Sequence, residues 1–127
     1  MNGFVDKIIE LLRTTSLTEI YSPFLVAEET SIGAVQIRPG GFSQEGLSNT
    51  VLYRGINFNV LIRGTESDSV SMGLAEEVFD KLKNVLNLSY TDGRIVHIKL
   101  DPPELVDRDE NRNLVYNVNG FAEIQKV

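Results

Sequence analysis

The chain has 127 residues, of which 42% are apolar and 24% charged, so it can form one folded domain and cannot be collagen-like or wholly disordered. Its 18 acidic and 12 basic residues give a formal charge of -6, and the scattered basic residues form no stripe for binding nucleic-acid phosphates. No apolar run approaches the roughly 18 residues that a membrane-spanning helix needs, and the amino-terminal segment does not resemble a signal peptide.

Residues for catalysis or metal binding are sparse in this sequence. It contains no cysteine, which excludes disulfides, thiolate nucleophiles and sulfur-ligated metal sites. The single histidine, His97, lies in an apolar run, and we expect it on the solvent or inter-subunit face of a strand, because catalysis and metal binding need partners at matching distances. Gly40 and Gly41 lack the lysine of a phosphate-binding loop. The sequence therefore predicts no catalytic residue, no metal and no cofactor.

The first elements are a helix, a strand and a long loop. Apolar residues at helical spacing predict an amphipathic helix over residues 3–15. A short, partly β-branched run predicts a strand over residues 32–37, bounded by a proline and two glycines. Residues 38–50 are rich in glycine and serine and are expected to form a loop of a length that is uncommon in a compact domain.

The middle of the chain has the clearest periodicity. Residues 51–63 alternate between an apolar face and a polar face, which predicts a long strand with one buried side. The apolar face consists of Ile56, Phe58, Val60 and Ile62, and the other face carries Asn57, Asn59 and Arg63. Capping residues at 65–69 precede a helix that should run from Val70 to about Asn87, with Glu77 and Lys81 spaced to form an ion pair.

The last third predicts two more strands separated by a second long connection. Asp92 and Gly93 indicate a turn before a strand over residues 95–100, in which Val96, Ile98 and Leu100 share a face. A connection over residues 101–113 leads into a final strand from Leu114 to about Ile124. Its apolar face holds Leu114, Tyr116, Val118, Ala122 and Ile124, and its polar face holds Asn117, Asn119 and Glu123. The glycines at 55 and 120 are candidates for β-bulges.

These elements predict an α+β fold in a single domain spanning residues 1–127. Each strand has one apolar face, so the economical arrangement is a mainly antiparallel β-sheet with two α-helices packed on one face and long loops. Binding residues concentrate in such loops.

The second loop allows four interpretations, one of which is a plain solvated turn. The spacing of Asp107, Asp109 and Asn111 is similar to the first ligands of a calcium-binding loop, but Arg112 replaces the required glycine and Val118 the bidentate glutamate. The same carboxylates could serve as acid and base in a small hydrolase. A hairpin tip or loop that touches a protein partner is favoured, and a calcium-binding interaction module and a hydrolase remain as alternatives.

Four segments together resemble the minor capsid, or tail terminator (tail completion), proteins of long-tailed phages and prophages. They are residues 40–42, 60–64, 75–82 and the run 108–111 leading into 116–119. The resemblance covers about residues 30–127 and departs from the family pattern at Asp107, where glycine is common, and at Gly120, where a large apolar residue is usual.

The resemblance implies a non-enzymatic virion protein of the tail-neck region, made in the bacterial cytoplasm. Such a protein forms a ring of copies, expected to be a hexamer, that caps the head-proximal end of the tail tube, ends tube polymerisation and joins the tail to the head connector. Its partners would be itself, the tail tube protein and the head connector or stopper protein, with DNA passing through the lumen without specific binding and no membrane involved. A head-side neck or stopper protein is the neighbouring alternative.

On this interpretation the partner contacts fall in the loops and at the strand ends. The predicted partner-binding residues are Arg38, Phe42, Leu47, Arg63, Arg108, Asp109 and Arg112. The polar strand faces, which carry Asn57, Asn59, Asn117 and Asn119, suit a ring lumen or a wet interface.

Overall fold

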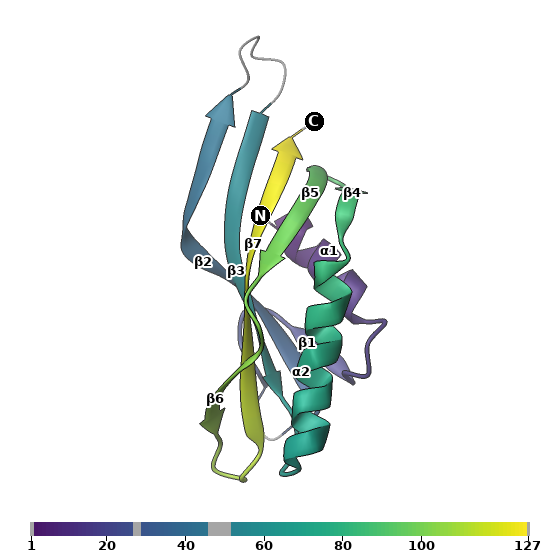
Figure 1. Ribbon diagram of the computed structural model, residues 1–127, viewed down its shortest axis with the longest axis vertical. Coiled ribbons are helices and arrows are strands. Elements are labelled where there is room, and N and C mark those ends of the chain that lie inside the picture. Colours follow the sequence, from purple (N-terminus) through teal and green to yellow (C-terminus); the bar gives the residue numbers. More distant parts are fainter. Residues whose placement is uncertain (1, 27–28, 46–51, 127) are drawn as a thin grey trace.

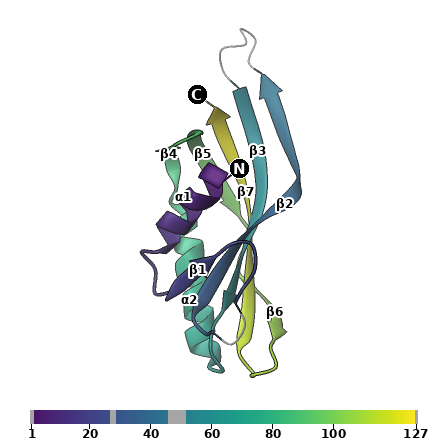
Figure 2. The same ribbon diagram turned by 180° about the vertical axis from the view of Figure 1, so that it is seen from behind.

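The computed structural model describes residues 2–26, 29–45 and 52–126 and shows two helices on one face of a curled sheet (Figures 1 and 2). The helices are α1 (Asn2–Leu12) and α2 (Asp68–Lys83). The strands are β1 (Glu19–Tyr21), β2 (Ile32–Glu45), β3 (Leu52–Arg63), β4 (Leu86–Tyr90), β5 (Gly93–Leu100), β6 (Glu104–Arg108) and β7 (Leu114–Lys126). The predicted α+β class, with a mainly antiparallel sheet, is confirmed.

The sheet is organised around β3 and β7, which pair along their whole lengths. Its strand order is β1-β2-β3-β7-β5-β4, with β6 pairing to β7 beside this path, and β1–β2 is the one parallel pair among the described strands. On its second edge β7 pairs with β6 over its first residues and with β5 over its last. The central strand β7 therefore links β3 to both β5 and β6 along its length (Figure 1).

The core lies between the helices and the apolar face of β3 and β7. The predicted inward residues of β3 are at most 2% exposed, and those of β7 are likewise buried. Phe4, Ile8 and Leu12 of α1 and Leu74, Val78 and Leu82 of α2 pack against them. The alternation therefore places Asn59, Asn117 and Asn119 on the opposite side of the sheet, which we call the outer face.

The second helix is shorter than its apolar spacing predicts. Ser67 caps it by accepting a hydrogen bond from the backbone N–H of Val70, and it ends at Lys83 rather than near Asn87, because residues from Leu86 onward pair as β4. The predicted Glu77–Lys81 pair does not form. The Glu77 carboxylate instead accepts hydrogen bonds from the backbone N–H and the hydroxyl of Ser16, at 2.7 and 3.2 Å, which ties α2 to the segment that follows α1.

The prediction of a loop over residues 38–45 is wrong, because these residues continue β2 and pair with β3. The two strands form a hairpin that extends past the ends of the other strands (Figure 1). Arg38 pairs with Asn57 and Phe42 pairs with Gly55, so β2 advances by four residues where β3 advances by two. The glycine-rich stretch between Arg38 and Phe42 is therefore a bulge. Gly40 has φ of +95°, and a Cβ on Gly41 would lie 2.1 Å from the carbonyl oxygen of Gly55. The glycines thus permit a bulge and a close approach within a strand. Residues 46–50 of the predicted loop lie outside the described residues.

The second predicted loop also contains a strand, β6, which pairs with β7 to form a hairpin whose turn lies at residues 109–113. In β5 an extra residue between Ile95 and His97 shifts the register, so Ile95 is buried in the core and Val96 does not share the face of Ile98. The strands β1 and β4 were not predicted.

Gly120 does not form a bulge, because its register with Phe58 is continuous. Its function is steric: a Cβ at this position would lie 2.6 Å from the Phe58 ring. Within the described ranges, neither helix is long and apolar enough to cross a membrane.

Candidate assembly surface

A row of hydrogen-bonded amides crosses the outer face of the sheet from β2 to β7. The Asn59 side-chain N–H group donates to the Oε1 atom of Gln36 at 3.0 Å and to the Oδ1 atom of Asn117 at 2.8 Å. Asn117 donates in turn to Asn119 at 3.0 Å, and the Arg38 guanidinium donates to the same Asn119 oxygen at 2.8 Å. We call these five residues the amide row. Mutual hydrogen bonds satisfy part of their polar groups and fix the side chains in one arrangement.

The amide row forms the floor of an open groove with a volume of about 610 Å³. One wall is the segment 22–26, which contributes Phe24, and the other is Val106 of β6. Phe24 is 72% exposed and Val106 is 48% exposed, so both walls present apolar side chains to solvent. Leu61, the apolar exception in the polar face of β3, adds to the groove. The groove thus combines hydrogen-bonded polar groups with exposed apolar side chains, and both kinds of group occur in protein interfaces.

The segment that forms the first wall is anchored to β2. The Ser22 hydroxyl donates to the carbonyl oxygen of Val35 at 2.7 Å, and the Tyr21 hydroxyl donates to the Glu29 carboxylate at 2.7 Å. This hydrogen bond raises the pKa of Tyr21, and desolvation and the negative charge of Glu29 act in the same direction. These two hydrogen bonds therefore hold the segment 22–26 in a defined position beside β2.

Arg63, the last residue of β3, contacts the segment before β2 and the turn that follows β6. Its Nε atom lies 3.1 Å from the Oδ2 atom of Asp109, and its Nη1 atom donates to the carbonyl oxygens of Val26 and Glu29. The side chains of Arg63 and Asp109 are only 14% and 20% exposed.

The turn between β6 and β7 presents two arginines at the far end of the hairpin. The Oδ1 atom of Asp109 accepts hydrogen bonds from the backbone N–H groups of Asn111 and Asn113, both at 2.9 Å, so the carboxylate forms the turn. Arg108 and Arg112 are exposed, and the Arg108 guanidinium donates to the carbonyl of Arg112 at 3.3 Å. Arg112 has φ of +69°.

His97 lies on the outer face of β5, half exposed, with its Nε2 atom 2.9 Å from the Glu123 carboxylate. This agrees with the predicted position on a solvent-facing side of a strand. In the described ranges, no group of three or more histidine or acidic side chains is placed to hold a metal ion.

The structure brings only some of the predicted partner-binding residues together. Arg63 and Asp109 are in contact, Arg108 and Arg112 share one turn, and Arg38 lies at the groove. The backbone of Phe42 pairs with Gly55 in the projecting hairpin, and Leu47 lies outside the described residues. Gln36, Phe24 and Val106 were missed, because the groove joins residues that are far apart in the chain.

No family model matches the sequence, and no curated protein matches it. The fold is similar to that of a chain from a solved structure described as the virion of a native gene transfer agent (GTA) particle, with a TM-score of 0.67. The match covers 98% of this chain and 96% of that chain at 14% sequence identity. The two chains therefore share an α+β architecture over nearly their whole lengths.

Proposed function

We propose that this chain is a structural protein of a phage-like virion and acts by assembly. The observation that carries the proposal is the fold likeness to a GTA virion chain, which extends over 98% of this sequence. The open groove on the outer face is consistent with it, because a polar, internally fixed surface with apolar walls can be covered by another protein subunit.

Within the virion we propose the position implied by the family resemblance, a tail terminator at the head-proximal end of the tail tube. A ring of six copies would end tube polymerisation and present a surface to the head connector. A ring needs two different surfaces on each copy that meet head to tail. The groove is one such surface, and the projecting β2–β3 hairpin offers a second. The net charge of -6 suits a conduit through which DNA passes without being held.

The proposal is tested by the mass of the purified chain in solution and by its effect on tube assembly. We expect a species of six times the 14.2 kDa chain mass, alone or after tube protein is added. We also expect shorter tubes in electron micrographs when the chain is present during polymerisation. Binding to purified connectors but not to tubes would instead assign the chain to the head side, as a neck or stopper protein. A chain that stays monomeric and binds neither would refute the proposed function.

Charge reversal at the groove gives a matched test of the surface. Arg38→Glu reverses the exposed positive charge of the amide row. Arg13→Glu is the control, because it reverses an exposed charge just beyond α1, on the helix side of the sheet. We expect Arg38→Glu to weaken assembly with little change in thermal stability and Arg13→Glu to assemble normally. If both variants assembled equally well, the groove would not be part of the interface between copies.

A further inference from the structure

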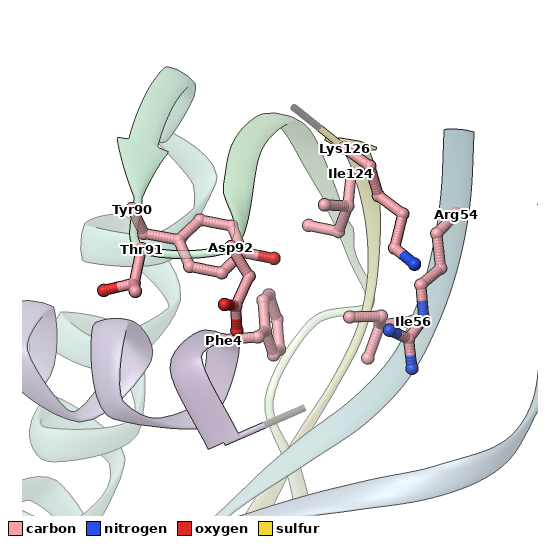
Figure 3. Close-up of a pocket in the computed structure, with 8 residues that line it drawn as sticks. All are labelled: Phe4, Arg54, Ile56, Tyr90, Thr91, Asp92, Ile124 and Lys126. Atoms are coloured by element: carbon pink, nitrogen blue, oxygen red, sulfur yellow. The ribbon is translucent and has the colours of Figure 1, made fainter. Parts of the chain in front are cut away.

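A second cavity lies on the helix side of the sheet, apart from the groove. It has a volume of about 400 Å³ and is bounded by the amino-terminal turn of α1, the β4–β5 turn and the ends of β3 and β7 (Figure 3). Its apolar lining comes from Phe4, Ile56 and Ile124, all at most 2% exposed, and from the ring of Tyr90. The cavity thus has an apolar floor of buried side chains and opens at the end of the sheet where the β2–β3 hairpin projects.

Two cations line this cavity where the sheet pattern calls for apolar residues. Arg54 pairs with Ile124 across β3 and β7, so its side chain is on the helix-facing side, and Lys126, two residues after Ile124, is on the same side. In Figure 3 both side chains extend on one side of the cavity, with Tyr90, Thr91 and Asp92 on the other. Within the described part of the chain neither cation forms an ion pair. Two neighbouring cations repel each other, and an anion bound between them would offset that repulsion.

The acid in the cavity, Asp92, also lies against the amino terminus of α1. Its carboxylate packs against Gly3, where a Cβ would lie 2.4 Å from the Oδ2 atom. The first turn of α1 contains no acidic residue of its own, so Asp92 supplies the negative charge that a helix amino terminus favours. Burial raises the pKa of the Tyr90 hydroxyl, and the negative charge of Asp92 raises it further. The positive charge of Arg54 lowers it, so Tyr90 lies within the electrostatic reach of both residues.

We propose that this cavity binds the carboxylate of an acidic side chain from a second copy of this chain. Arg54 and Lys126 would bind the carboxylate, and the apolar floor would receive the methylene groups next to it. The chain has 18 acidic against 12 basic residues, so another copy is a complementary partner for a cationic cavity. A ligand with several phosphate groups fits less well than one carboxylate, because two cations against one acid, Asp92, leave the cavity able to neutralise about one negative charge. The choice of a second copy rests on the proposed function.

The carboxylate site is tested first with a small probe. We expect N-acetylglutamate amide to shift the NMR signals of Tyr90 and Ile124, while N-acetylglutamine amide, its neutral analogue, does not. Arg54→Gln with Lys126→Gln should weaken this binding roughly tenfold or more, whereas Lys99→Gln, an exposed change on the outer face, should leave it unchanged.

Asp92→Asn provides a readout in the opposite direction. Removing the competing anion should strengthen probe binding about two- to fivefold, and a general structural defect would not do so. Equal binding of the two amides, or tighter binding of inorganic phosphate than of the glutamate probe, would overturn the carboxylate assignment.

The occupant is tested by sedimentation of the chain and of the Arg54→Gln, Lys126→Gln double variant. We expect the double variant to assemble less than the parent chain while remaining folded by circular dichroism. Normal assembly of the double variant would overturn the second copy as occupant and leave the proposed function standing. A parent chain that does not assemble, yet binds the glutamate probe, would overturn the proposed ring and this occupant together, but not the carboxylate site.

Discussion

Replacing Gly120 by alanine should destabilise the protein through a clash with one aromatic ring. The added Cβ would lie 2.6 and 2.7 Å from two ring carbons of Phe58 and 3.1 Å from Leu100, whereas carbon atoms in ordinary contact are about 3.5–4.0 Å apart. The ring has little room to retreat, because it is fully buried and packs edge-on against Phe4 with centroids 5.3 Å apart. Overpacking of this kind costs about 1–3 kcal/mol, and the backbone gain from losing a strand glycine offsets about 0.5–1 kcal/mol.

The net loss, about 1–2 kcal/mol, is measurable by urea unfolding. With a slope of about 2 kcal/mol per molar urea, this loss should lower the unfolding midpoint by roughly 0.5–1 M. Gly73→Ala is the matched control, because nothing lies within 4 Å of the new methyl on α2, and it should stabilise the chain by about 0.5–1 kcal/mol. Phe58→Leu should relieve the clash, so that Gly120→Ala costs less in that background. A Gly120→Ala variant as stable as the parent, or an equal cost in both backgrounds, would refute the reasoning.

Three further changes test other contacts. Ser71→Ala should cost about 1–3 kcal/mol by urea unfolding, because its buried hydroxyl donates to the carbonyl of Thr65 and accepts from the Thr65 N–H group; an unchanged midpoint would contradict this. Burial first, and then the hydrogen bond to Asp68, raise the pKa of Tyr116 above its usual value near 10, so this contribution to stability is present below pH 10 and is lost as the pH rises further. Tyr116→Phe should flatten that alkaline decline, and identical pH profiles would count against the assignment. Asp109→Ala should cost about 1–3 kcal/mol and Asp109→Asn less, because the amide oxygen can still accept from the backbone of the turn; equal losses would show that the ion pair matters more than the turn.

The parts of the fold that could be predicted are those with one buried face. The alternation in β3 and β7 identified the inward residues because each strand has the core on one side and solvent on the other. The continuation of β2 was missed because its proline and glycines are typical of loops, although here they form a bulge in a paired strand. All five residues of β6 are exposed, so its sequence carries no burial pattern, and its pairing with β7 alone makes it a strand.

The candidate surfaces could be predicted only where the residues involved follow the polar and apolar alternation of a single strand. The asparagines of β3 and β7 were expected to share a polar face, and they do. Their link to Gln36 depends on the register between β2 and β3, which no local pattern encodes. The carboxylate site was not foreseen, because Arg54 and Lys126 become neighbours only when β3 pairs with β7.

The position of β7 has a consequence for how the protein is synthesised. Each strand with which β7 pairs, namely β3, β5 and β6, precedes it in the chain. On a translating ribosome these strands emerge before the strand that joins them, so the sheet cannot close until residue 126 has left the exit tunnel. Contacts between such distant segments also form slowly. Nascent chains should therefore expose unpaired edges of β3, β5 and β6 until β7 emerges, and this is when chaperone binding would be most useful.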